Sequence, residues 1–184
     1  MNKKIINTTL IIFIALFLTT ITYAYTVEMN FWRESRLQQS PHHDDGTQYI
    51  PSASQFIQNG CGTGTVLDKK HGLCWDGNGN RFGTSNWTQA NDVDCAGLTL
   101  GGRTDWRLPT INELLTLVRD EGTNSGTYLN GLGVGFSSYQ NSWYWTGDIR
   151  ASDTSHAWVV TLDDGRVTHS AVTNLGRVVC VARY

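Results

Sequence analysis

The sequence predicts an α+β domain with two helices, a small and mostly antiparallel sheet, and disulfide bonds that staple these elements together. Two helix patterns lie in the middle of the chain, and the last third is rich in β-branched and aromatic residues. The four cysteines all follow the apolar N-terminal segment. Helices that precede a series of short strands are typical of this fold class.

The first residues have the pattern of a secretory signal peptide. Lys3 and Lys4 precede an apolar run at residues 10–18, and small residues follow as far as Ala24. A basic start, a short apolar core and a small-residue end are the three parts of such a signal. We therefore expect residues 1–24 to direct export, with cleavage near Ala24; retention as a membrane anchor is the alternative.

A polar leader and one domain are expected after this segment. Residues 25–60 contain few apolar side chains and no steady period, which predicts a stalk or a loosely docked leader. Residues 61–184 then form a domain of about 120 residues, an ordinary size. Without the two lysines of residues 1–24, the mature chain has 12 basic and 16 acidic side chains. Its net charge of −4 argues against a nucleic acid held by bulk attraction.

Two short strands and a helix are predicted at the start of the domain. The strands cover residues 64–68 and 72–75 and are joined by a polar turn. Residues 87–98 follow as a helix that Asn86 or Ser85 can cap.

The strongest local pattern lies at residues 100–114. Gly101-Gly102 permits a turn at positive φ, and the apolar run that follows Glu113 predicts a helix over residues 111–120. Thr110 and Glu113 have the spacing of a capping box at its start. We expect a structural role for Asp105, Trp106, Arg107, Leu108, Pro109, Thr110 and Glu113.

The C-terminal third is predicted to be β structure, after a Gly-, Ser- and Asn-rich loop at residues 121–141. Long ordered loops in small domains are often functional. Asp163-Asp164-Gly165 predicts a hairpin turn. Strands are expected over residues 143–146, 157–162, 166–171 and 177–183, the last of them central and buried.

An even number of cysteines behind an export signal predicts disulfides. Four cysteines allow three pairings, of which we favour Cys61–Cys74 as a local bond and Cys95–Cys180 as a long-range bond. The C-x-x-C spacing typical of zinc sites is absent, so we expect no metal centre.

A calcium site remains an open alternative to this expectation. Residues 76–80 begin like an EF-hand loop, but Arg81 and Trp87 stand where that motif requires Gly and Glu. A plain polar loop is the better interpretation, and no cofactor is predicted.

Aromatic side chains near the end of the chain are the best candidates for ligand contact, because rings stack on sugars and anchor protein interfaces. We expect Trp143 and Tyr144 to be exposed, and Trp106, Trp145 and Trp158 to lie in the core. The candidate ligand-binding residues are Trp143, Tyr144, Asp148, Arg150, Asp153 and His156.

Short motifs follow one another in a fixed order from Thr63 to the end of the chain. They include Trp87-x-x-Ala90, Cys95, Leu98 to Gly102, Asp105 to Thr110 with Glu113, Tyr144-Trp145-Thr146, Ala157 to Val160, Asp164-Gly165, and Val178 to Val181. This series resembles the Lcl C-terminal domain family, long described as a domain of unknown function. The resemblance implies a C-type-lectin-like fold, in which the first helix is commonly joined to the last strand; this again implies Cys95–Cys180.

The resemblance also implies an exported or surface-displayed module. We therefore expect a non-catalytic, adhesin-like domain that binds a carbohydrate or a surface protein outside the cell or in the periplasm. A structural or self-assembling subunit of a surface appendage is a second hypothesis, and an oligomer is compatible with both. A third is an oxidase similar to the formylglycine-generating enzymes, which share the R-L-P-T core and use a reactive cysteine pair with copper. Membrane contact is expected only through an uncleaved N-terminal segment.

Overall fold

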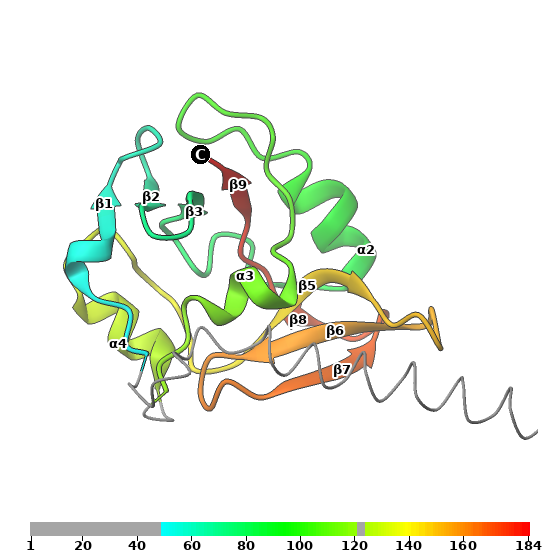
Figure 1. The fold of residues 1–184 in the computed structure, drawn as a ribbon. Coiled ribbons are helices and arrows are strands. Elements are labelled where there is room, and N and C mark those ends of the chain that lie inside the picture. The colour runs from blue at the N-terminus through cyan, green and yellow to red at the C-terminus, as the bar shows by residue number, and fades with distance from the viewer. Residues whose placement is uncertain (1–48, 121–123) are drawn as a thin grey trace, which may run out of the picture. The chain divides into compact units, whose positions relative to one another are not determined.

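A computed structural model describes residues 49–120 and 124–184 (Figure 1). The predicted signal peptide and the predicted leader up to residue 48 lie outside the described residues. Within the described part, none of the helices has the length and apolar character needed to cross a membrane.

The fold is α+β, as predicted, and its strands form two sheets. The described strands are β1 (Phe56–Gln58), β2 (Thr65–Asp68), β3 (Leu73–Asp76), β4 (Thr84–Ser85), β5 (Trp143–Ile149), β6 (His156–Thr161), β7 (Val167–Ala171), β8 (Gly176–Arg177) and β9 (Val181–Arg183). One sheet has the order β1-β2-β3-β9 and the other β4-β8-β5-β6-β7. Neighbouring strands run antiparallel except β5 and β8, which are parallel.

Short helices connect and cover the strands (Figure 1). They are η1 (Ala53–Gln55), α2 (Trp87–Gln89), the π-helical segment η2 (Ala90–Cys95) that continues α2, α3 (Ile111–Leu115) and α4 (Ser125–Gly131). The predicted helix over residues 87–98 is therefore largely confirmed. The second helix is shorter than predicted, because the chain continues beyond Leu115 in single turns.

The prediction of an irregular loop over residues 121–141 was wrong, because α4 lies within it. Its Gly, Ser and Asn residues have low helix propensity, which tertiary contacts override here. Leu129 is completely buried in the core. The side-chain oxygen of Asn141 accepts a hydrogen bond from the Thr127 N–H (3.1 Å). Neither contact is visible in the local sequence pattern.

The central strands are buried on both faces by two hydrophobic clusters. Trp75 and Tyr144 belong to the first cluster, which also contains side chains of α3 and α4. Their neighbours Cys74 and Trp145 point the opposite way, into the second cluster beside η2. A strand with a core on each side has no exposed face, so continuous apolar runs are favourable in it.

The domain begins earlier than predicted, since residues 49–60 pack within it. β1 pairs with β2 in register, with Ile57 opposite Leu67. Phe56 is buried and meets the ring of Phe136 edge to face, with centroids 4.9 Å apart. The low apolar content of this segment concealed the few side chains that anchor it.

The apolar run predicted as one strand over residues 177–183 is divided between the two sheets. β8 ends at Arg177, and β9 begins at Val181. Between them the Cys180 carbonyl accepts a hydrogen bond from the Asp76 N–H (3.0 Å). The chain thus passes from one sheet to the other through residues 178–180.

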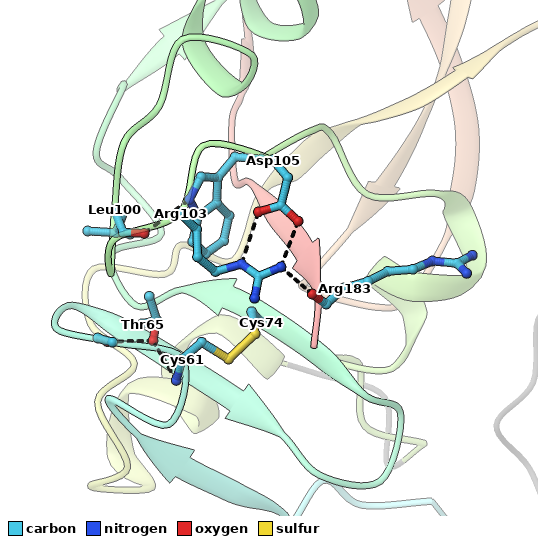
Figure 2. Close-up of a disulfide and its surroundings, with 9 residues drawn as sticks. Cys61, Thr65, Cys74, Leu100, Arg103, Asp105 and Arg183 are labelled. Atoms are coloured by element: carbon cyan, nitrogen blue, oxygen red, sulfur yellow. Dashed lines mark hydrogen bonds and ion pairs between the residues drawn. A yellow bond between two sulfur atoms is a disulfide. The ribbon is translucent and has the colours of Figure 1, made fainter.

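Both predicted disulfides are present, and no cysteine is free. Cys61–Cys74 joins the turn before β2 to β3, as Figure 2 shows. Cys95–Cys180 joins η2 to the connection between β8 and β9 across 85 positions of sequence. The second bond therefore ties the helical layer to the end of the chain.

Candidate functional site

The structure separates the predicted ligand-binding residues into two groups. Trp143 lies opposite Thr161 at one end of the β5–β6 pair, and Ile149 lies opposite Ala157 at the other. Arg150 and Asp153 belong to the turn beyond that second end, and His156 is the first residue of β6. Trp143 and Tyr144 therefore do not form one surface with them.

Tyr144 is completely buried, so the prediction of an exposed ring was wrong. Its hydroxyl accepts a hydrogen bond from the Gln140 N–H at 2.8 Å and lies 3.3 Å from the Gly79 carbonyl, to which it donates. Burial raises the pKa of this phenol, although the Gln140 hydrogen bond opposes the shift. The ring is inaccessible because β5 is covered on both faces.

Trp143 is half-buried rather than free. Its ring meets Trp145 edge to face at 5.2 Å between centroids, and it lies close over the backbone of Gly176. Trp106, Trp145 and Trp158 are buried, as predicted. The rings of this region therefore serve mainly as core.

Asp148 supports the start of α3. Its carboxylate accepts a hydrogen bond from the Ile111 N–H at 2.8 Å. Burial raises its pKa, and the repulsion of Glu113 adds to this effect, whereas the Ile111 hydrogen bond lowers it. This placement gives Asp148 a structural role.

The Arg107–Glu113 pair lies beside the same helix. The guanidinium donates two hydrogen bonds to the carboxylate, at 2.7 and 2.6 Å. Thr110 and Glu113 complete the predicted capping box. Burial alone raises the pKa of Glu113, but the hydrogen bonds from Arg107 and Thr110 outweigh it and leave the pKa below its usual value.

We expect Glu113→Gln to lower stability at neutral pH and to reduce its acid dependence. Because the folded pKa is lowered, Glu113 stabilises the protein above its unfolded pKa, and this contribution disappears as pH falls through the folded pKa. Urea unfolding from about pH 6 to about pH 3 measures the difference. Asp105→Asn is the control, since Asp105 forms an exposed pair with Arg103 and should change the profile much less. Identical acid profiles for wild type and Glu113→Gln would contradict the assignment.

A cleft of about 460 Å³ opens at this corner of the domain. It lies between the β2–β3 turn, α3 and the end of β9. Its lining residues are His71, Gly72, Leu73, Asn112, Glu113, Thr116, Arg183 and Tyr184. The sequence interpretation missed this site, because three segments distant in sequence supply it and the capping-box motif that contains Glu113 indicates a helix start rather than a cleft.

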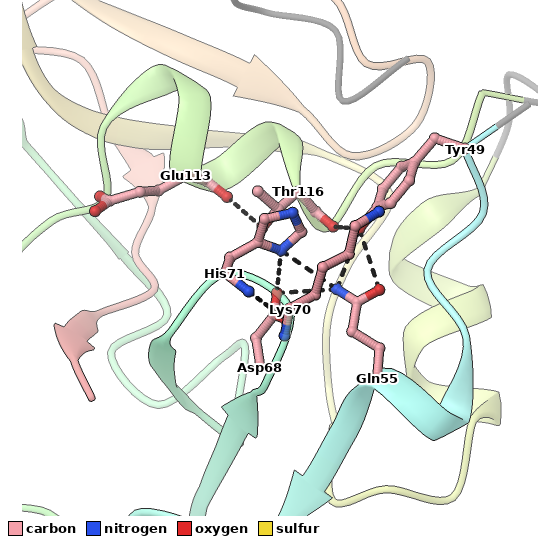
Figure 3. A network of polar contacts seen from close by, with 7 residues as sticks. All are labelled: Tyr49, Gln55, Asp68, Lys70, His71, Glu113 and Thr116. Atoms are coloured by element: carbon pink, nitrogen blue, oxygen red, sulfur yellow. Dashed lines mark hydrogen bonds and ion pairs between the residues drawn. The ribbon is translucent and has the colours of Figure 1, made fainter. Parts of the chain in front are cut away.

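A polar network fixes His71 at the edge of the cleft (Figure 3). Its Nδ1 lies 2.7 Å from Oδ2 of the fully buried Asp68, which also accepts from the Gln55 amide at 3.0 Å. The hydroxyl of Tyr49 joins Gln55 to the Thr116 carbonyl, and burial raises the pKa of Tyr49 to about 12. Because a carboxylate only accepts, Nδ1 is the donor and Nε2 remains available.

The loop over residues 100–105 is anchored near the same strand end. Arg103 donates hydrogen bonds to the carboxylate of Asp105 and to the Arg183 carbonyl (Figure 2). Its hydrogen bond lowers the pKa of Asp105. The structural role predicted for Asp105 is thus explained by a tie between this loop and β9.

In the loop that resembles a calcium site, the first carboxylate already accepts hydrogen bonds from groups of the same loop. Asp76 is buried and accepts two hydrogen bonds from Arg81, at 2.6 and 2.8 Å. The Asn78 N–H donates a third. In the described part of the chain, no three His, Cys, Asp or Glu side chains are grouped so that they could hold a metal ion.

A family model described as the Lcl C-terminal domain matches residues 64–182. The match spans both sheets apart from β1 and the last residue of β9. A search of curated proteins found no match to the chain.

Proposed function

Because the chain belongs to the Lcl C-terminal domain family, we propose that it is a non-catalytic, adhesin-like binding module and that its cleft recognises a carbohydrate. The cleft replaces Trp143 and Tyr144 as the binding site, since those rings serve the core. A surface protein is the alternative ligand, and self-assembly is a further one.

The observation that carries this proposal is that some of the polar side chains lining the cleft have no hydrogen-bond partner in the part of the chain that the structure describes. Within the described residues, the Asn112 amide and the Arg183 guanidinium form no side-chain hydrogen bond. Tyr184 is 73% exposed at the rim. A flat ring beside polar groups that have no partner in the described part of the domain suits a sugar, which has apolar faces and hydroxyl edges.

We also propose an exported protein with a C-type-lectin-like fold. Two disulfides and the pattern of residues 1–24 support export. The bond from η2 to the connection before β9 supports the fold assignment, because it joins the helix formed by α2 and η2, the first one that the sequence predicted, to the end of the chain. The two bonds also leave no thiol pair for the copper oxidase chemistry of the third hypothesis. We expect a free-thiol count of zero on the purified protein.

A glycan array tests the proposed function. We expect the full, oxidised chain to bind one class of glycan saturably, in buffer with calcium and in buffer with chelator. Loss of binding with chelator would add a metal to the site. A blank array with folded protein would contradict carbohydrate recognition and favour a protein partner or self-assembly, which light scattering at two concentrations would separate.

Tyr184→Ala and Asn112→Ala are each expected to weaken binding of the selected glycan at least about tenfold, with an unchanged melting temperature. Both side chains are exposed, so the fold should tolerate their loss. Thr88→Ala is the matched control, since Thr88 lines a separate, smaller cleft of about 340 Å³ beside α2. Isothermal titration calorimetry measures the affinities. Equal affinities for the three variants and wild type would exclude the cleft.

A further inference from the structure

We propose that His156 and His169 form a binding site for a transition-metal ion of the Cu²⁺ or Zn²⁺ class. The site lies where β6 and β7 meet, away from the cleft. It provides two imidazole ligands, and water completes the coordination.

The two histidines are neighbours on one face of the sheet. Trp158 pairs with His169, and His156 precedes Trp158 by two positions, so all three side chains share a face. The ring centroids of His156 and His169 are 5.2 Å apart. Since a metal–nitrogen bond measures about 2.0 Å, one ion between two imidazoles requires a separation of this order. The rings are nearly perpendicular, at 88°, and His169 is exposed, with its ring edge to face against Trp158 at 6.0 Å between centroids. Chelation requires a rotation of the His169 ring.

Asp153 prepares His156 for this role. Its carboxylate lies 2.7 Å from Nδ1 of His156. The same carboxylate accepts hydrogen bonds from the Ser155 N–H at 3.1 Å and the Ser155 hydroxyl at 2.6 Å, which fix it beside His156 as an acceptor. Nδ1 is therefore the donor, and the lone pair of Nε2 is left for a metal. A carboxylate behind a ligating histidine is a recurrent arrangement in metal sites, where it orients the ring and increases its basicity.

The ligand set determines the class of ion. Imidazole nitrogen suits copper, zinc and nickel, whereas calcium and magnesium require oxygen ligands. Affinity for such a site follows the order Mn²⁺ below Ni²⁺ below Cu²⁺, with Zn²⁺ weaker than Cu²⁺. We therefore expect Cu²⁺ to bind most tightly and Ca²⁺ not to compete.

The test is a Cu²⁺ titration of the full, oxidised chain by calorimetry, together with electron paramagnetic resonance to count bound nitrogens. His42 and His43 precede the described residues and are replaced by Asn in every sample, so that they do not contribute. We expect one ion per chain and two imidazole nitrogens. His156→Gln and His169→Gln should each weaken binding by at least about tenfold and reduce the count to one nitrogen.

Two further variants make the outcome specific. Asp153→Asn should weaken binding about tenfold while two nitrogens remain bound, because Asp153 orients a ligand without being one. Thr168→Ala, next to His169 on the opposite face of β7, should bind as wild type. The reference protein carries only the Asn replacements of His42 and His43. The proposal is overturned if His169→Gln binds Cu²⁺ as tightly as this reference, or if the reference itself shows a single bound nitrogen.

Discussion

Replacement of Cys95 and Cys180 together by alanine is expected to lower the free energy of unfolding by about 4–5 kcal/mol. The bond spans 85 positions, and cross-links over long loops restrict the unfolded chain most. Both cysteines are fully buried in the second hydrophobic cluster, so the change also removes packed sulfur atoms. Small domains have a free energy of unfolding of about 5–15 kcal/mol, so this bond supplies a large part of it. Urea unfolding of oxidised proteins measures the loss.

The other disulfide is the internal control. Cys61–Cys74 spans only 13 positions, for which the same relation predicts about 3 kcal/mol. The ratio of the two effects therefore tests whether restriction of the unfolded chain dominates. A larger loss for the Cys61/Cys74 double variant would contradict this explanation.

Gly101→Ala is expected to cost about 3 kcal/mol or more. Gly101 has a φ of 64°, and a Cβ atom there would lie 2.6 Å from the Cys61 carbonyl oxygen. A contact of that kind forces two backbone segments apart beside the Cys61–Cys74 bond. Thermal and urea unfolding measure the cost.

Gly102 is the matched control for Gly101. It also has a positive φ, of 78°, but a Cβ atom there meets nothing within 4 Å. Gly102→Ala should therefore cost only about 1 kcal/mol, the price of the left-handed conformation for alanine. Equal losses in the two variants would show that backbone conformation, and not the close approach, makes Gly101 necessary.

Elements with strong local patterns were predictable from the sequence. The capping box of Thr110 and Glu113 forms as expected, because its hydrogen bonds join residues three positions apart. Asp164-Gly165 lies in the turn between β6 and β7, where the Asp164 carboxylate accepts from the Arg166 N–H. Such interactions depend on neighbours in sequence and need no knowledge of the rest of the fold.

Elements that depend on distant partners were not predictable in this way. α4 has a poor helical sequence, and its contact with Asn141 comes from beyond the helix. Tyr49 and Phe56 are anchors in a polar segment, and their partners lie far along the chain. Local propensity contains no information about either.

The candidate site shows the same limit. Alternation along β5 suggested an exposed ring, but two clusters cover that strand, and Tyr144 is buried. The cleft depends on three segments that only the fold brings together. Arg150, Asp153 and His156 lie near one another because they are close in sequence, in the β5–β6 turn and at the first residue of β6. His169 was missed, since strand register alone places it beside His156.

The sheet order β1-β2-β3-β9 bears on the order in which strands and disulfides form while the chain is synthesised. A ribosome releases the chain from its N-terminus, so β1, β2 and β3 can pair while β9 has not yet been synthesised. In an oxidising compartment, Cys95 then emerges long before Cys180, its partner. Early closure of Cys61–Cys74 removes the two thiols with which Cys95 could mispair during this interval. We therefore expect early closure of the short-range disulfide to limit mispairing of Cys95, an effect that its contribution to equilibrium stability does not measure.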